Sequence, residues 1–136
     1  MSPGVDIAAA PGRILIVDDA PDNRELLQIM LNWEGFVTTT AGSGEEALTS
    51  AAEQTPDLIL LDLGLPGMGG CEVTIQMKGN VATKDIPIMI ISGRSDNLTR
   101  RNVLSAGAAD FITKPIDRSD LCRRVRNILG LVAAGS

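Results

Sequence analysis

The stretch LILLDLGLPGMGG, residues 58–70, joins an aliphatic run, a single carboxylate and a loop rich in Gly and Pro. Four consecutive aliphatic residues without polar alternation are typical of a strand buried on both faces, as in a parallel sheet covered by helices. The run ends at Asp62, where the bendable loop begins. The stretch therefore predicts a buried strand that presents one acid at its carboxyl end.

Four further stretches are predicted strands. The runs RILIVDD (13–19) and IPIMIIS (86–92) are apolar in the same non-alternating way, whereas FVTTT (36–40) and ADFITK (109–114) carry weaker strand patterns.

Helical stretches separate these strands. From Pro21 to Trp33 an apolar stripe predicts a helix, and Pro21 suits its first turn. Ser43 and Glu46 form a capping-box pattern that opens the next helix. The stripe of the first helix consists of Leu26, Leu27, Met30 and Leu31. The remaining predicted helices are 70–79, 96–106 (stopped by Gly107) and 118–129 (followed by Gly130).

Strand and helix alternate five times along the chain. Such alternation implies an α/β fold, a five-stranded parallel sheet with helices on both faces and right-handed crossovers. Five strands suit the flavodoxin-like (βα)5 order 2-1-3-4-5, in which ligands bind outside the carboxyl ends of the strands where the winding reverses.

The chain has 136 residues, enough for one compact domain. We expect a flexible N-terminal arm over 1–11, the domain over 12–130 and a C-terminal tail over 131–136. The net charge of −5 argues against direct nucleic-acid binding, which favours a basic surface. No apolar run approaches the ~20 residues of a membrane span, and the N-terminus lacks the basic start of a signal peptide. We therefore expect a cytoplasmic protein without a membrane partner.

The cysteines Cys71 and Cys122 are isolated, and the chain has no histidine. A zinc site and imidazole-based catalysis are therefore disfavoured. A disulfide is possible, but two free thiols in a reducing cytosol is the better interpretation.

Polar residues gather at one edge of the predicted sheet. The first strand ends in Asp18 and Asp19, the third in Asp62, the fourth in Ser92 and the fifth in Lys114. Two unit charges 4 Å apart interact by roughly 1 to 4 kcal/mol, so three carboxylates in one cleft need a cation to offset their repulsion. Oxygen ligands without His or Cys favour Mg²⁺.

These groups together suggest phosphoryl transfer. A metal and Lys114 would stabilise negative charge on the transferred group, and Ser92 could donate a hydrogen bond to a phosphoryl oxygen. The nucleophile would be a carboxylate that forms an acyl phosphate. Asp62 is the best candidate because it stands alone on the central strand, while Asp18 and Asp19 resemble a paired metal clamp.

The pattern resembles the receiver domain of two-component response regulators over about residues 12–130. The matching motifs are the acidic pair in LIVDDAPDN (15–23), the aspartate in LLDLGLPGMGG (60–70), the hydroxyl in MIISG (89–93) and the lysine in DFITKP (110–115).

The resemblance implies a role for each matching residue. Asp62 would accept a phosphoryl group from a phosphohistidine on a sensor histidine kinase or a phosphotransfer protein. Asp19, Asp62 and the backbone carbonyl of Gly64 would ligate Mg²⁺, with Asp18 positioning a metal-bound water. Lys114 would contact the phosphoryl oxygens.

The resemblance also implies a switch. Ser92 would swing toward the phosphoryl group, Phe111 would follow as the aromatic switch residue, and the Lys114–Pro115 bond would be cis. The surface formed by 96–106, 109–114 and 118–129 would be the output face for an unknown downstream protein, and the chain would be a monomer or a phosphorylation-dependent dimer. Such a domain promotes only its own phosphorylation and dephosphorylation and is not otherwise an enzyme.

The sequence departs from the family pattern at several positions. Gly64 stands where the family often has a larger side chain that shapes access to the phosphoryl group, so a short-lived phosphoryl state is expected. Gly69 stands where Asp is frequent, Gly93 where Ala is common, and Phe111 lacks the hydroxyl of a tyrosine.

Other interpretations remain open for the same residues. The acids could be solvated loop residues, Asp62 with Lys114 a structural ion pair, Ser92 a turn residue and Phe111 core. A Mg²⁺-dependent phosphatase with an aspartyl nucleophile, a phosphorylation-independent interaction domain and a flavin-binding flavodoxin relative are the rival functions. We expect Arg123, Arg124 and Arg126 to lie on a solvated helix face. Arg100 and Arg101 have the same interpretation, although they could touch a partner.

Overall fold

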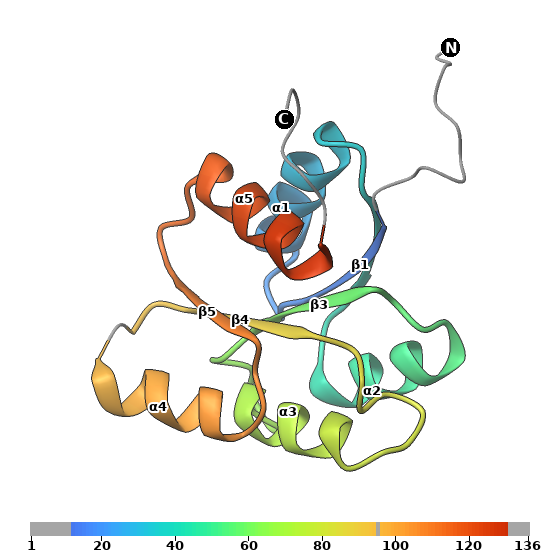
Figure 1. The fold of residues 1–136 in the computed structure, drawn as a ribbon, viewed down its shortest axis with the longest axis vertical. Helices are drawn as coiled ribbons and strands as arrows, with labels where there is room; N and C mark the ends of the chain where they lie inside the picture. The colour runs from blue at the N-terminus through green and yellow to red at the C-terminus, as the bar shows by residue number, and fades with distance from the viewer. Residues whose placement is uncertain (1–11, 95, 131–136) are drawn as a thin grey trace.

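The computed structural model describes residues 12–94 and 96–130, which form a parallel five-stranded sheet between two helical layers (Figure 1). The strand order is β2-β1-β3-β4-β5, as predicted. The strands are β1 (Arg13–Val17), β2 (Val37–Ala41), β3 (Leu58–Asp62), β4 (Ile88–Ser92) and β5 (Asp110–Thr113). The expected arm over 1–11 and tail over 131–136 lie outside the described residues.

Helices α1 and α5 cover one face of the sheet, and α2, α3 and α4 cover the other (Figure 1). Their bounds are α1 (Pro21–Trp33), α2 (Gly44–Glu53), α3 (Gly70–Lys78), α4 (Asn97–Ser105) and α5 (Arg118–Leu129). Among the described residues, no helix is long and apolar enough to cross a membrane.

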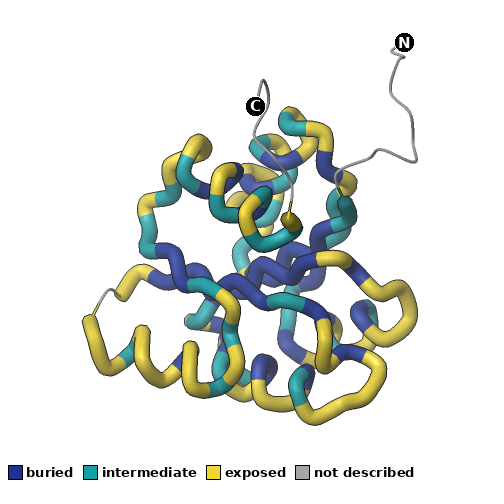
Figure 2. Tube along the Cα trace, in the orientation of Figure 1, coloured by how far each residue is buried: buried dark blue, intermediate teal, exposed yellow. Residues whose placement is uncertain are grey.

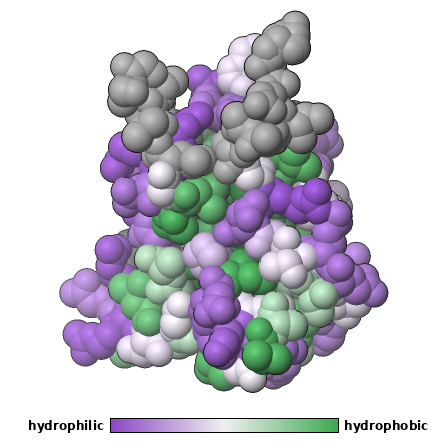
Figure 3. Space-filling view, turned by 45° about the vertical axis from the view of Figure 1, so that its right-hand side comes forward, coloured by the Kyte–Doolittle hydropathy of each residue, from purple (hydrophilic) through white to green (hydrophobic). Residues whose placement is uncertain are grey.

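The sheet separates two hydrophobic clusters, because side chains alternate between its faces. Every residue of β3 and β4 is buried, as their uninterrupted apolar runs predicted (Figure 2). On the face shown in Figure 3, hydrophobic side chains are interspersed with hydrophilic ones. Because the central strands are buried along their length, their polar groups can meet a ligand only where the strands end.

The helix termini follow local chemistry. The Ser43 hydroxyl accepts a hydrogen bond from the Glu46 amide, as the capping box predicted. The Glu46 carboxylate, however, accepts from the Gly42 amide, one residue before the partner that a capping box would use. Gly130 ends α5 in the left-handed conformation, with φ of 73°. Gly69 is the N-cap residue of α3, and because it has no side chain, α3 begins without a side-chain capping bond.

Two helices, α1 and α4, bury only part of their apolar residues. On α1, Leu27 and Leu31 are buried, but Leu26 is 51% exposed because it lies on the side of the helix away from the sheet. On α4 only Val103 is buried, which leaves α4 the least anchored of the helices by apolar contacts.

The expectation that the basic residues lie on solvated helix faces was wrong for two of them, Arg124 and Arg126, which are partly buried. Arg124 contacts Asp110 at 3.0 Å and Asp120 at 3.1 Å, so it joins α5 to the start of β5. Arg126 pairs with Glu34 at 2.6 Å and stacks over the Phe36 ring. Arg100 is exposed, as expected, although its guanidinium also lies over the Phe111 ring. The sequence pattern missed these contacts because their acidic and aromatic partners come from distant segments.

Candidate functional site

The carboxyl edge of the sheet brings together all five polar groups that the sequence placed there. Asp62 is the last residue of β3 and Ser92 the last residue of β4, while Asp18 and Asp19 directly follow β1 and Lys114 directly follows β5. Strands β1, β3 and β4 are consecutive neighbours in the sheet, so parallel pairing alone places their ends side by side.

Asp18, Asp19 and Asp62 form an acidic cluster. One carboxylate oxygen from each of these residues lies within 4.8 Å of an oxygen of the other two. One cation could bridge this separation. Asp18 is buried and Asp19 is exposed. The cluster therefore has a buried side that fixes it and an open side that a ligand can reach.

Asp18 is fixed by its own loop. Its Oδ1 atom accepts a hydrogen bond of 2.9 Å from the Ala20 amide, and its backbone oxygen accepts one of 2.7 Å from Arg24. These bonds hold the turn between β1 and α1, and they leave the second carboxylate oxygen, Oδ2, free to face the cluster.

Asp62 is only 8% exposed, and two donor groups lie close to its Oδ1 atom. The Gly64 amide donates to it at 3.2 Å, and the Lys114 ammonium lies 3.7 Å away. Burial raises the pKa of Asp62 above its usual value, and the Asp18 and Asp19 charges add to this effect. The Gly64 hydrogen bond and Lys114 act in the opposite direction without cancelling it. Burial thus makes the ionised form of Asp62 costly in spite of these two partners.

Gly64 lies directly against this carboxylate. A Cβ atom built at Gly64 would be 3.9 Å from Asp62 Oδ1, at ordinary contact distance. A larger side chain at position 64 would therefore stand next to any group attached to Asp62, as the family resemblance implied.

Ser92 is held by the loop that follows it. Its hydroxyl oxygen accepts a hydrogen bond of 2.9 Å from the Arg94 amide, and its side chain is buried. The hydroxyl hydrogen remains free to donate to another acceptor.

Phe111 is 2% exposed and lies within the cluster between the sheet and α2, α3 and α4. The Arg100 guanidinium of α4 lies 5.8 Å from the ring centroid. A cation in this position is attracted to the ring face by about 0.5–1 kcal/mol at an exposed site.

The Lys114–Pro115 peptide bond is cis, as the resemblance implied. Beside it lies a hollow of about 250 Å³, lined by Asp18, Lys114 and Pro115 together with apolar residues of α1 that include Leu26 and Met30. Sequence reasoning missed this hollow because it forms between segments far apart in the chain.

The comparisons with known proteins agree with this geometry. A sequence model described as the response regulator receiver domain matches residues 14–126. The DNA-binding response regulator MtrA of Mycolicibacterium smegmatis is 42% identical over 114 residues, which cover 84% of this chain and 49% of MtrA. The response regulator PleD of Caulobacter vibrioides is 42% identical over 116 residues, which cover 85% of this chain and 26% of PleD. The chain thus spans at most about half the length of these relatives.

A solved structure adds a neighbour with a metal. The receiver domain of the sensor histidine kinase PA1611 from Pseudomonas aeruginosa, described with a magnesium ion in its active-site cleft, superposes with a TM-score of 0.81 at 31% identity. The match covers 88% of this chain and 98% of that domain. The chain belongs to the response-regulator receiver family, whose members are signalling domains of two-component systems.

The raised pKa of Asp62 leads to a stability prediction. The folded state binds the Asp62 proton more tightly than the unfolded state, so the ionised carboxylate costs stability at pH values above its folded pKa. Asp62→Asn removes that cost, and we expect it to raise Tm at pH 7 by a few degrees in the absence of divalent ions, the shift that ~1 kcal/mol produces in a domain of this size.

The gain should shrink as the pH falls through the raised pKa of folded Asp62, and it should vanish below the ordinary pKa of 3.8, where Asp62 is protonated in both states. Thermal unfolding of wild type, Asp62→Asn and the exposed-acid control Glu72→Gln across this pH range checks it. An Asp62→Asn gain that is absent at pH 7, or that grows as the pH falls, would contradict the account.

Proposed function

We propose that Asp62 accepts a phosphoryl group from a phosphohistidine of a sensor histidine kinase or a phosphotransfer protein. The observation that carries the proposal is the meeting of a nearly buried aspartate with two further acids, a lysine and a serine hydroxyl at one sheet edge. The chain contains no histidine, so the donor must supply it.

In the proposed reaction an Asp62 carboxylate oxygen attacks the phosphorus atom of the donor. The bond from phosphorus to the imidazole nitrogen breaks, a bond from phosphorus to the Asp62 oxygen forms, and the electron pair returns to the imidazole. Lys114 is placed to contact the phosphoryl oxygens, because its ammonium lies 3.7 Å from the carboxylate that receives them.

The donor set fits Mg²⁺, which prefers hard oxygen ligands. Asp19, Asp62 and the Gly64 carbonyl would ligate the ion, and Asp18 would position one of its waters. When bound, the ion supplies positive charge that offsets the carboxylates and the phosphoryl oxygens. This charge would also offset the cost of ionising Asp62, whose pKa is raised first by burial and further by the Asp18 and Asp19 charges.

The switch follows from two restraints. If the Ser92 side chain swings toward a phosphoryl oxygen, its hydroxyl leaves the Arg94 amide, and the backbone that leads toward α4 loses this restraint. For Phe111 to change position, Arg100 must leave its ring, which moves α4 itself. Since α4 buries only Val103, these movements meet little apolar resistance. Phosphorylation would thereby shift a population between two arrangements of the α4-β5-α5 face.

That face would bind a downstream protein, with Arg124 as the ion-pair link between α5 and β5. MtrA is described as DNA-binding, but the net charge of −5 supports a protein rather than DNA as the direct partner of this domain. The family supports a cytoplasmic location.

The rival enzymatic function has less support. An aspartyl-nucleophile phosphatase needs an acid two residues after the nucleophile to protonate the leaving group, and that position holds Gly64. We propose that the chain promotes only the gain and loss of its own phosphoryl group.

Intact mass measurement tests the proposal. Wild type incubated with Mg²⁺ and acetyl phosphate or phosphoramidate should gain one phosphoryl mass, and Asp62→Asn should gain none. Asp57→Asn, an acid at the opposite edge of the sheet, is the matched control and should behave like wild type. Wild type that gains no phosphoryl group with either donor, or an Asp62→Asn variant that gains one, would overturn it.

Gly64 sets the expected lifetime of the phosphoryl state. Because Gly64 has no side chain to crowd the Asp62 oxygens, water can approach the acyl phosphate freely. Gly64→Asn should slow hydrolysis severalfold, measured as the loss of phosphoryl mass after the donor is removed. Gly93→Ala, which adds a Cβ in open space, serves as the control. Equal decay rates in wild type and Gly64→Asn would refute this explanation of the lifetime.

A further inference from the structure

Arg24, in the first turn of α1, donates a hydrogen bond to the loop that carries the acidic pair. Its Nη1 atom lies 2.7 Å from the backbone oxygen of Asp18, six residues earlier in the chain. Side chains of a helix lean toward its N-terminus, so an arginine in the first turn can reach back over the preceding loop. The Arg24 side chain is half-buried, and the proposed reaction assigns no role to it.

The bond from Arg24 fixes one of the peptide groups that flank Asp19. The oxygen that accepts this bond belongs to the peptide between Asp18 and Asp19. The peptide on the other side, between Asp19 and Ala20, is held through its amide, which donates to Asp18 Oδ1 at 2.9 Å. Because both peptides are held, backbone contacts determine the direction in which the Asp19 side chain leaves the loop.

The Asp19 carboxylate depends on this restraint of its backbone. Asp19 is exposed, and among the residues that the structure describes no hydrogen bond or ion pair involves its carboxylate. In contrast, the carboxylates of Asp18 and Asp62 each accept a hydrogen bond from a backbone amide. The orientation of Asp19 toward the acidic cluster therefore follows from the loop that carries it.

Arg24 is itself held in place by its surroundings. Its amide donates to the Ala20 oxygen at 3.1 Å, where α1 begins. Its guanidinium lies against the loop after β2, where a Cβ atom built at Gly42 would be 3.3 Å from Nη1. The Gly42 amide donates to the Glu46 carboxylate, which fixes that loop to α2. The side chain of Arg24 is thereby confined between the loop after β1 and the loop after β2.

We propose that Arg24 is a positioning residue for Mg²⁺, which orients Asp19 toward the acidic cluster through the Asp18 carbonyl. The inference rests on the proposed function, because Asp19 is one of the ligands assigned there. Residues that orient metal ligands without touching the metal typically change the affinity about 10- to 100-fold when they are replaced. Arg24 acts through one backbone bond, so we expect an effect of about tenfold.

Electrostatic repulsion predicts a change of the opposite sign. A guanidinium repels a divalent cation, so removal of its charge would by itself strengthen Mg²⁺ binding. Loss of the bond to Asp18 would weaken Mg²⁺ binding, because Asp19 would no longer be held toward the cluster. The direction of the change in affinity therefore distinguishes a positioning residue from a nearby charge.

Calorimetric titration of Mg²⁺ into wild type and Arg24→Met tests the proposal. Methionine has a similar aliphatic stem but neither the charge nor the N–H donors. Arg24→Met should bind Mg²⁺ about tenfold more weakly than wild type. Arg24→Lys, which keeps the charge and a donor, should bind more tightly than Arg24→Met. A merely structural role would lower the Tm of the metal-free variant without changing the Mg²⁺ affinity of the folded protein.

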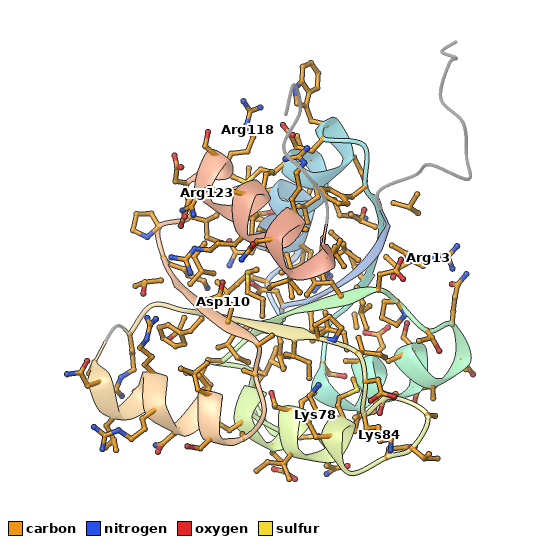
Figure 4. The ribbon with its side chains drawn as sticks, in the orientation of Figure 1. Arg13, Lys78, Lys84, Asp110, Arg118 and Arg123 are labelled. Carbon is orange, nitrogen blue, oxygen red and sulfur yellow. The ribbon has the colours of Figure 1, made fainter. Side chains whose placement is uncertain are left out.

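Arg13→Met is the matched control. Arg13 is the first residue of β1, so it lies at the opposite edge of the sheet from Asp18 (Figure 4). The substitution removes the same charge and the same donors as Arg24→Met does. Arg13→Met should therefore bind Mg²⁺ as wild type does.

Equal affinity in wild type and Arg24→Met, or tighter binding by the variant, would overturn the role of Arg24 and leave the metal site intact. An Arg24→Lys variant that binds no more tightly than Arg24→Met would also overturn it. A wild type without saturable binding would refute the metal site itself and this inference with it.

Discussion

The parallel sheet forces negative charges together, and the rest of the site depends on how that repulsion is balanced. Because β1 and β3 are neighbours that point the same way, the acids that end them must share one edge. A single lysine, 3.7 Å from Asp62, supplies the nearest positive charge and leaves the pKa of Asp62 raised. We therefore infer that this edge of the sheet binds a cation, and that the cation helps to bind a phosphoryl group.

The proposed switch would connect this edge of the sheet to the surface through α4. Ser92 is tied to the Arg94 amide at the start of the loop to α4, and Phe111 is covered by Arg100 from α4. The first link runs from the end of β4 toward α4 and the second from β5 to α4, a helix with few buried apolar residues. In contrast, Arg124 and Arg126 join α5 to Asp110 of β5 and to Glu34 after α1, so we expect α4 to move more readily than α5.

Much of this could be predicted from the sequence, for physical reasons. The apolar runs of β3 and β4 are buried on both faces, and such runs are typical of a parallel sheet. The strand order of that sheet then places Asp18, Asp62 and Ser92 at one edge. Contacts between side chains of distant segments could not be predicted, because the spacing of residues along the chain does not determine which distant residues meet. Arg124 with Asp110 is one example, and the exposure of Leu26, which sequence periodicity assigned to the core, is another.

Calorimetric titration with Mg²⁺ at constant ionic strength tests the central claim most directly, because it asks only whether the acidic cluster forms a cation site. Wild type should show saturable binding that Asp19→Asn and Asp62→Asn each abolish, while Glu72→Gln, an exposed acid on α3, binds as wild type does. Wild type without saturable binding, or binding that survives the loss of either acid, would contradict the account.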